Sequence, residues 1–375
     1  MRIIRKSEIK GIVALLLIAL VLGIILAGMS GKLEQWGLPW FTGAKALDNI
    51  IFVSDRSGTK EIYVMNLDGS SQKQLTREAK VLSPPAIPAS GNKIAFVGMI
   101  GDMSQVMAIG VDGGTPRPLT ASSGPKRQPD FSPNGKKLSY IDAGKVYVAE
   151  LNGGNPDPVL PNHEELVAAM GDPMGRAAIP RYSAYAWGSD SESMAGVSSQ
   201  DRITDALAYI PSQEGKLQRI MPPDPGTKVS GLAFAANKAL LVASVEIGAQ
   251  QLVIVYDPAE GKPHPVLALQ KVKLGAPAVS PDGSVVLLQV NPIVGRQAPG
   301  LLKIDLQSGQ AGMLVKGIFE NPKFSPNGES ILAAQHNAKT GKRSIVMIDP
   351  ASGEVTQLAT DGDCFDAVFS PMSAK

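Results

Sequence analysis

A short turn motif recurs along this chain and constrains its fold more than any other feature. Phe-Ser-Pro-Asn-Gly occupies residues 131–135 and returns at residues 324–328. The variant Val-Ser-Pro-Asp-Gly occupies residues 279–283, and a truncated Phe-Ser-Pro stands at residues 369–371. With three degenerate copies, the repeat is anchored at positions 87, 131, 187, 234, 279, 324 and 369, which are 44, 56, 47, 45, 45 and 45 residues apart. A period in the forties is typical of an array of equivalent supersecondary units.

One repeat, residues 129–160, predicts its own secondary structure. Proline presets the backbone for the second position of a turn, and Gly135 accepts the left-handed conformation that closes it. Alternating apolar and polar residues at 137–141 and 145–151 predict two strands. The run 156–160 contains prolines and therefore suits only the edge of a sheet. The expected unit is a four-stranded antiparallel meander.

Several of the predicted strands are apolar on both faces, for example residues 50–53 and 285–288. Such strands must be covered on both sides. Stacking small sheets face to face around an axis does this, which is the arrangement of a β-propeller. Seven outer-strand endings predict seven blades, at residues 75–76, 119–120, 159–160, 219–220, 266–267, 313–314 and 357–358. A six-bladed ring with one degenerate unit is the alternative.

The two ends of the repeat array are complementary. The first unit begins near Asp48 with its second strand, whereas residues 365–371 form an inner strand with nothing after it. We expect the C-terminal strand to complete the first blade, since closure removes an unpaired sheet edge. Cys364 is the only cysteine, so no intrachain disulfide can form, and at this seam we expect a buried, inert thiol.

The spacing of 56 marks an insertion within residues 161–183. Asn162 is a good helix-capping residue, and the sequence after it predicts a short helix over residues 162–170. Long loops in propellers often carry function. A functional loop and a neutral surface insertion both remain open.

The N-terminal region predicts a membrane anchor. Residues 11–29 contain no charge and are dominated by Leu, Ile, Val and Ala; 19 residues are enough to cross a bilayer as a helix. Four basic residues and one acid lie in residues 1–10, which the positive-inside rule places in the cytoplasm. We therefore expect a single-pass signal anchor in the cytoplasmic membrane, with the propeller on the extracytoplasmic side. A cleaved signal peptide is the alternative.

Residues 30–47 are interpreted as a juxtamembrane spacer before a propeller at residues 48–375. Trp36 and Trp40 in this spacer either lie at the lipid interface or pack on the globular domain. The formal net charge of only +2 argues against a dedicated nucleic-acid binder.

Local motifs for chemistry are missing from the sequence. None of the three histidines, His163, His264 and His336, has a second histidine or a cysteine at metal-ligand spacing. No G-x-S-x-G elbow and no phosphate-binding P-loop occurs. We predict no catalytic residues, no metal site and no cofactor. A propeller enzyme can nevertheless assemble its site from several blades, so enzymatic activity stays an open alternative.

Charged residues gather on the loops that join the second and third strands and on those that join the blades. We predict a binding surface there, which comprises Asp55, Arg56, Lys126, Arg127, Arg181, Asp201, Arg202, Arg296 and Arg343. The excess of Arg and Lys favours an anionic partner, such as an envelope polymer or an acidic protein surface. Each residue also has a simpler interpretation as a solvated or turn-stabilising charge, and Asp55 and Arg56 in particular could pin their turn.

Residues 54–69, followed by Gln74, Leu75 and Thr76, resemble the repeat of TolB-like β-propellers, and the Phe-Ser-Pro-Asn/Asp-Gly turns resemble the same repeat. The resemblance extends over about residues 48–375. It implies a propeller fold, and the family includes the periplasmic TolB, a protein-binding member of an envelope complex. Similar repeats also precede the hydrolase domain of prolyl-oligopeptidase-like enzymes. TolB itself places a small α/β domain before a six-bladed ring, whereas this chain has an anchor, a spacer and seven expected blades.

The expected function is therefore a membrane-anchored platform that binds an envelope protein. The alternatives are a propeller enzyme, a hydrolase or lyase acting on a glycan, lactone or peptide, and a small-ligand-binding sensor domain. A cluster of carboxylates or histidines at the channel mouth would favour the enzyme. A flat, apolar or basic face would favour a protein partner. The sequence does not predict the oligomeric state.

Overall fold

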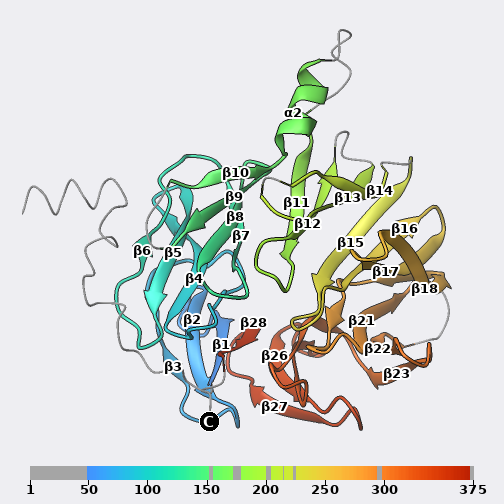
Figure 1. Cartoon of the computed structure of the whole chain (residues 1–375). Coiled ribbons are helices and arrows are strands. Elements are labelled where there is room, and N and C mark those ends of the chain that lie inside the picture. Colours follow the sequence, from blue (N-terminus) through green and yellow to red (C-terminus); the bar gives the residue numbers. More distant parts are fainter. Residues whose placement is uncertain are drawn as a thin grey trace, which may run out of the picture.

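The computed structural model describes residues 49–151, 155–171, 179–199, 204–213, 215–222, 225–293 and 298–371. These residues form seven small antiparallel sheets arranged around a common axis (Figure 1). The predicted cytoplasmic residues 1–10, membrane helix 11–29 and spacer 30–47 lie outside the described residues. Within the described ranges, no helix has the length and apolar character needed to cross a membrane.

The first three blades follow the predicted meander, each with its strands in order from the axis outward. Blade 1 contains β28 (Cys364–Phe369), β1 (Asn49–Ser54), β2 (Glu61–Asn66) and β3 (Lys73–Gln74). Blade 2 contains β4 (Lys93–Ile100), β5 (Met103–Gly110) and β6 (Arg117–Pro118). Blade 3 contains β7 (Lys126–Phe131), β8 (Lys137–Asp142), β9 (Lys145–Glu150) and β10 (Asp157–Leu160).

The remaining four blades bring the number to seven, so the seven-bladed prediction is confirmed and the six-bladed alternative is wrong. Blade 4 contains β11 (Arg181–Trp187), β12 (Met194–Ser199), β13 (Asp205–Ile210) and β14 (Gln218–Met221), and blade 5 contains β15 (Thr227–Phe234), β16 (Leu241–Ile247), β17 (Gln250–Asp257) and β18 (Lys262–Gln270). Blade 6 contains β19 (Val272–Leu274), β20 (Ala278–Val279), β21 (Val285–Pro292), β22 (Gly300–Asp305) and β23 (Ala311–Lys316). Blade 7 contains β24 (Phe319–Phe324), β25 (Ile331–His336), β26 (Arg343–Ile348) and β27 (Val355–Ala359).

Two blades depart from four continuous strands, and proline accounts for both. In blade 2 the inner strand is reduced to a single bridge between Ala86 and Ala95, within a segment that contains Pro84, Pro85 and Pro88. In blade 6 the inner strand is split into β19 and β20 on either side of a break that contains Pro277. Proline has no N–H to donate to a sheet ladder, so a proline-rich inner strand cannot pair along its whole length.

The recurring turn is held by its serine side chain. In blade 3 the Ser132 hydroxyl accepts the N–H of Lys137 at 3.0 Å and donates to Oδ1 of Asn134 at 2.8 Å. Gly135 has a φ of +67°, the left-handed region that glycine adopts without penalty. The equivalent serine bonds occur in blades 6 and 7, at 2.8 Å and 3.0 Å. The motif recurs because one side chain closes the hairpin that joins the inner strand to the next.

The ring closes where the other blades have this turn. Ser370, the serine of the truncated copy, accepts the N–H of Asn49 at 2.9 Å, and its own N–H donates to the Asn49 carbonyl at 2.8 Å. β28 pairs antiparallel with β1, so the two ends of the array lie side by side (Figure 1). The predicted closure by the C-terminal strand is confirmed, with hydrogen bonds in place of the covalent turn.

The strands that are apolar on both faces are covered on both faces, as predicted. Ile50, Ile51, Phe52 and Val53 of β1 are each at most 1% exposed. One side packs within a cluster that includes Val368 of blade 1 and Ile94 of blade 2. Burial of this kind is the main stabilising contribution in a chain without disulfides.

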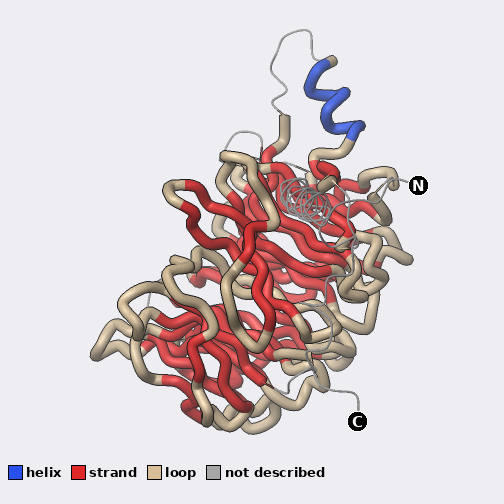
Figure 2. Tube along the Cα trace, turned by 90° about the vertical axis from the view of Figure 1, so that its left-hand side faces the viewer, coloured by secondary structure: helices blue, strands red, loops and turns tan. Residues whose placement is uncertain are grey.

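The insertion forms the predicted short helix, α2 (His163–Met170). Asn162 caps it, with its side chain accepting the N–H of Glu165, and the Glu165 carboxylate returns to the Asn162 N–H in a capping box. Glu165 is 5% exposed and also accepts the hydroxyl of Tyr182 at 2.8 Å, which ties the helix to blade 4. The helix projects beyond the body of strands (Figure 2), and its Met170 is 74% exposed.

Candidate binding face

The meander topology gives the ring two different faces. Connections between the first and second strands, and between the third and fourth, lie on one side, which we call the turn face. Connections between the second and third strands, and those between blades, lie on the other side, which we call the loop face. Every described residue of the predicted binding surface lies on the loop face or at the adjoining strand ends. Asp201, Arg202 and Arg296 lie outside the described residues.

Arg343 holds a cluster on the loop face of blades 7 and 1. Its Nη1 donates to Oε2 of Glu320 at 2.9 Å, while Nη2 and Nε donate to the Asp363 carboxylate at 2.5 Å and 3.0 Å. The guanidinium also lies over the ring of Phe365, 4.0 Å from its centroid. These bonds lower the pKa of Asp363 and raise that of Arg343. The cluster is therefore fully ionised near neutral pH.

Asp55 and Arg56 join the same cluster from the blade 1 side. Oδ1 of Asp55 accepts the N–H of Asp363 at 2.8 Å. Arg56 lies over the ring of Tyr63 at 4.8 Å and donates to Oε1 of Gln72 at 2.6 Å and, more weakly, to Sγ of Cys364 at 3.4 Å. Both residues thus bridge β1 and the segment that begins β28. Cys364 is 0% exposed, which confirms the expected buried thiol.

The three predicted cations of blades 3 and 4 differ in what they contact. Lys126 is 4% exposed; its Nζ donates to the carbonyls of Ser122 and Gly124 and lies 3.3 Å from Oδ2 of Asp142. Arg127 and Arg181 are exposed instead. These two arginines are the members of the predicted set whose positive charge faces solvent.

Sequence reasoning missed an acid–histidine pair beside the Arg343 cluster. Nε2 of His336 lies 2.7 Å from Oε1 of Glu320, and the His336 side chain is 31% exposed. Burial alone would raise the pKa of Glu320, but the hydrogen bonds from Arg343 and His336 outweigh it and lower that pKa. The pair comes from β24 and β25, 16 residues apart, a separation that matches no local motif.

Sequence reasoning also missed three charges on the inner strands around the axis: Asp130, Lys323 and Asp366. Burial raises the pKa of Asp130 to about 6, although the nearby Lys323 opposes this. Burial also lowers the pKa of Lys323 and raises that of Asp366, which accepts a hydrogen bond from Asn321 at 2.6 Å. The repeat contained a signal for two of them, because Asp130 and Lys323 each stand directly before the phenylalanine of the turn motif.

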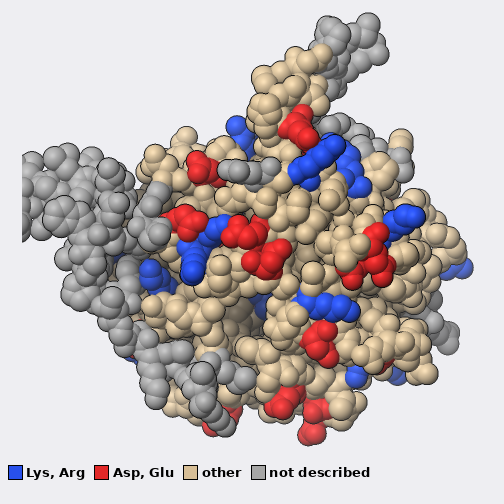
Figure 3. All heavy atoms as spheres, in the orientation of Figure 1, with Lys and Arg blue, Asp and Glu red and all other residues tan. Residues whose placement is uncertain are grey.

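Both signs of charge are interspersed over the face of the ring seen in Figure 3, without a broad patch of one sign. Across the part of the chain that the structure describes, no group of three or more His, Cys, Asp or Glu side chains is arranged to hold a metal ion. The surface is therefore a mixed polar one, with a self-paired cluster at the seam and free arginines on blades 3 and 4.

Comparison with curated proteins gives two partial sequence matches. The chain is 29% identical over 161 residues to a TolB homologue of Chlorobium luteolum and 32% identical over 148 residues to a TolB homologue of Chlorobium chlorochromatii. These alignments cover 30% and 28% of this chain, and 37% and 34% of the relatives, so the chain spans about a third of their length. No protein-family model matches the chain.

Solved structures share the fold over most of the chain. TolB from Acinetobacter baumannii superposes with a TM-score of 0.55 at 15% identity, covering 88% of this chain and 68% of that protein. An oligogalacturonate lyase in complex with manganese gives a TM-score of 0.61 at 12% identity, covering 84% and 86%. A prolyl endopeptidase gives 0.60 at 15% identity, covering 88% and 50%. Identities this low establish the fold alone.

The fold and the loop-face geometry define a closed seven-bladed β-propeller whose irregular connections are concentrated on one side. The partial sequence matches make it, more narrowly, a TolB-like propeller.

Proposed function

We propose that this protein is a membrane-anchored propeller that binds a protein partner in the cell envelope. In this proposal residues 11–29 span the cytoplasmic membrane, residues 30–47 form a spacer, and the propeller of residues 48–375 lies on the extracytoplasmic side. The observation that carries the proposal is the similarity to TolB homologues, since the family resemblance implies a protein-binding role in an envelope complex.

The geometry supports the loop face as the binding surface. Asn49, the first strand residue, lies at the turn face, because it pairs with Ser370 where the other blades have their turn. A chain that leaves the membrane and enters the ring there presents the opposite face outward. Arg127 and Arg181 lie on that loop face and are exposed. The partner surface is expected to be acidic around them.

The test is a pull-down from native membranes with two charge-matched variants of the full chain. In the first, Arg127→Glu and Arg181→Glu reverse the loop-face cations. In the second, Lys136→Glu and Lys262→Glu make the same charge change at exposed turn-face positions. We expect one envelope protein to be captured by the wild type and the second variant, and to be lost at least about tenfold in the first. Equal capture by both variants would remove the loop-face arginines from the interface.

One observation favours a second candidate, a propeller hydrolase or lyase. A carboxylate that bonds one ring nitrogen of a histidine is the arrangement that orients a general base, and Glu320 and His336 have it. His264 and Glu260 make a similar pair at 3.0 Å on the turn face and serve as the control. Polygalacturonate, peptide nitroanilides and aryl lactones are suitable probes. For an enzyme, His336→Asn should reduce turnover by at least about 100-fold and His264→Asn should not. No turnover of any probe by the wild type would count against this candidate.

A further inference from the structure

The turn face carries two grooves that lie next to each other. The first, about 380 Å³ in volume, lies between blades 5 and 6, and the second, about 480 Å³, lies mainly between blades 6 and 7. Both grooves are lined by Asp282 and Ser284, so the turn of blade 6 forms the ridge between them. We call them the 5/6 groove and the 6/7 groove.

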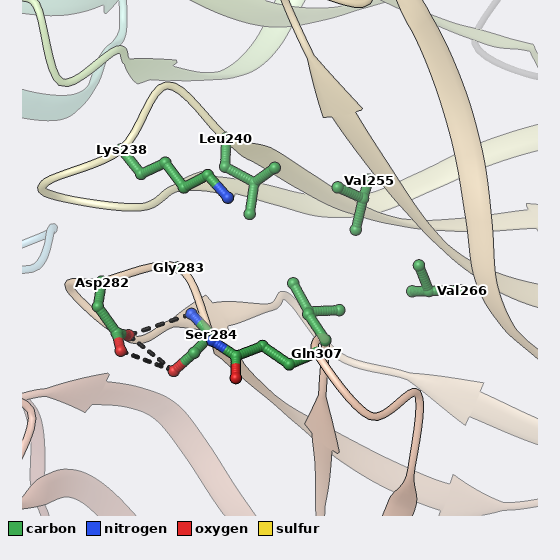
Figure 4. A pocket seen from close by; sticks show the side chains of 9 residues that line it. Lys238, Leu240, Val255, Val266, Asp282, Gly283, Ser284 and Gln307 are labelled. Carbon is green, nitrogen blue, oxygen red and sulfur yellow. Dashed lines mark hydrogen bonds between the residues drawn. The ribbon is translucent and has the colours of Figure 1, made fainter.

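The 5/6 groove is apolar with one cation at its wall. Leu240, Val255 and Val266 face the turn of blade 6 across it (Figure 4), and Val266 is 36% exposed. Asp282 on the ridge is bonded to Ser284 within its own turn, so its carboxylate is already occupied. The Lys238 side chain reaches into the groove from an exposed position.

The 6/7 groove is lined by flat apolar rings. Phe324 and three prolines, Pro281, Pro326 and Pro350, contribute to its walls, and Phe324 is only partly buried. Proline and aromatic rings pack well on one another in peptide recognition. The groove is therefore suited to an aromatic side chain.

The chain itself contains a segment of the right chemistry in the right place. Residues 36–41 read Trp-Gly-Leu-Pro-Trp-Phe, and they precede the first strand by only a few residues. That strand starts at Asn49, on the same turn face as the grooves. Trp40 is nine residues before Asn49, so it can reach about 30 Å, and Trp36 can reach about 45 Å.

We propose that residues 36–41 fold back along the turn face, with Trp40 in the 6/7 groove and Trp36 in the 5/6 groove. The order along the chain matches the order of the blades. Blade 7 is the ring neighbour of blade 1, where the chain enters, so the 6/7 groove is the nearer one and receives the nearer tryptophan. In this arrangement Glu34, two residues before Trp36, comes close to Lys238.

Docking would fix the turn face toward whatever precedes residue 36 in the chain. The inference stands apart from the proposed function, because it requires neither a membrane span nor a partner. It does make one difference to an anchored protein: the spacer becomes a rigid strap on the ring, so that the loop face points in one direction rather than many.

Disulfide trapping in the full chain, in detergent micelles, tests the proposal. Thr42→Cys is combined with Ala351→Cys, at the edge of the 6/7 groove, or with the control Ala121→Cys, an exposed alanine on the loop face. Cys364 is fully buried, which leaves the two introduced thiols to react. We expect the first pair to form an intrachain disulfide at least about tenfold faster than the control pair, because docking raises the effective concentration of its thiols.

Further variants and a lipid probe separate the rival occupants. Adding Trp40→Ala to the first pair should slow its crosslink about tenfold, whereas adding Lys32→Ala should not. Equal rates for the two cysteine pairs, or a disulfide formed only between two chains, would overturn the proposal; the second result would assign the grooves to another copy. Strong quenching of Trp36 and Trp40 fluorescence in nanodiscs of brominated phosphatidylcholine would also overturn it, because the tryptophans would then lie in lipid.

Discussion

The two faces of the ring are built differently. On the turn face, blades 3, 6 and 7 close with the same serine bond, and Ser370 makes the equivalent bond to Asn49 where no covalent turn exists. On the loop face no two blades are alike. Blades 7 and 1 share the Arg343 cluster, blade 3 buries Lys126, and α2 projects between blades 3 and 4.

This difference separates what builds the ring from what varies on it. The turn face repeats because each blade needs the same hairpin, and the seam shows that its hydrogen bonds suffice without a peptide link. The loop face has no such requirement, so its residues are free to differ between blades. Variable loops on a rigid scaffold are where binding sites usually form. Each of the following predictions tests one side of this comparison.

The largest effect is expected from removing the strand that both faces share at the seam. A chain that ends at Asp361 lacks β28 and leaves β1 as an open edge with its apolar residues uncovered. We expect loss of the cooperative thermal transition and aggregation on size-exclusion chromatography. A chain that ends at Pro371 is the control and should behave as the wild type. An unchanged melting temperature after removal of β28 would contradict the closure.

The next effect concerns the loop-face side of the seam. Arg343→Met leaves Glu320 and Asp363 without their shared cation. The free energy of unfolding should fall by about 2–3 kcal/mol, somewhat less than for a fully buried pair, because the Arg343 side chain is 21% exposed. Arg127→Met, at an exposed position, should cost less than about 0.5 kcal/mol in the same urea titration. Similar losses for both variants would mean that the cluster does not hold the seam.

A pH effect is expected from Asp130 on the axis. Burial raises its pKa to about 6, above that of an aspartate in an unfolded chain, so folding favours the neutral acid. The stabilisation is complete below about pH 4 and is lost as the pH rises through about 6. Because Asp130 is only partly buried, we expect the contribution to reach about 1–2 kcal/mol. In Asp130→Asn, stability measured from pH 4 to 7 should lose that slope; a variant that keeps the wild-type slope would exclude Asp130 as its source.

The smallest effect tests whether the turn face is uniform. Ser132→Ala, Ser280→Ala and Ser325→Ala each remove one hydroxyl that accepts a backbone N–H, at an expected loss of about 1 kcal/mol. Ser370→Ala removes the same bond at the seam and should cost at least as much, because no covalent turn holds the strands together there. A seam variant that costs clearly less than the other three would show that Ser370 contributes little to closure.

The fold was largely predictable because its rules are local. The spacing of the turns, the doubly apolar strands and the complementary ends predicted seven blades and their closure, and Asn162 predicted the start of α2. The bridge at Ala86 and the split at Pro277 were not predicted, because the repeat was followed through the proline-rich segments.

The site was less predictable for a physical reason. Arg343 was selected from the sequence as a loop cation, but its carboxylate partners come from β24 and from the segment before β28. Only the ring brings Glu320 and Asp363 to it. Likewise, the charges of Asp130 and Lys323 gain meaning only because two inner strands meet at one axis. Sequence spacing reveals which residues face one way within a blade, but not which blades face each other.

Site-specific photocrosslinking tests most directly the central claim that the loop face is the partner surface. A photoreactive amino acid replaces either Lys145, on the loop face of blade 3, or Lys136, on the turn face of the same blade; both lysines are exposed. The account predicts that, in native membranes, the position of Lys145 forms a discrete crosslink to one envelope protein and the position of Lys136 does not. A crosslink to that protein from Lys136 alone, or from neither position, would contradict it.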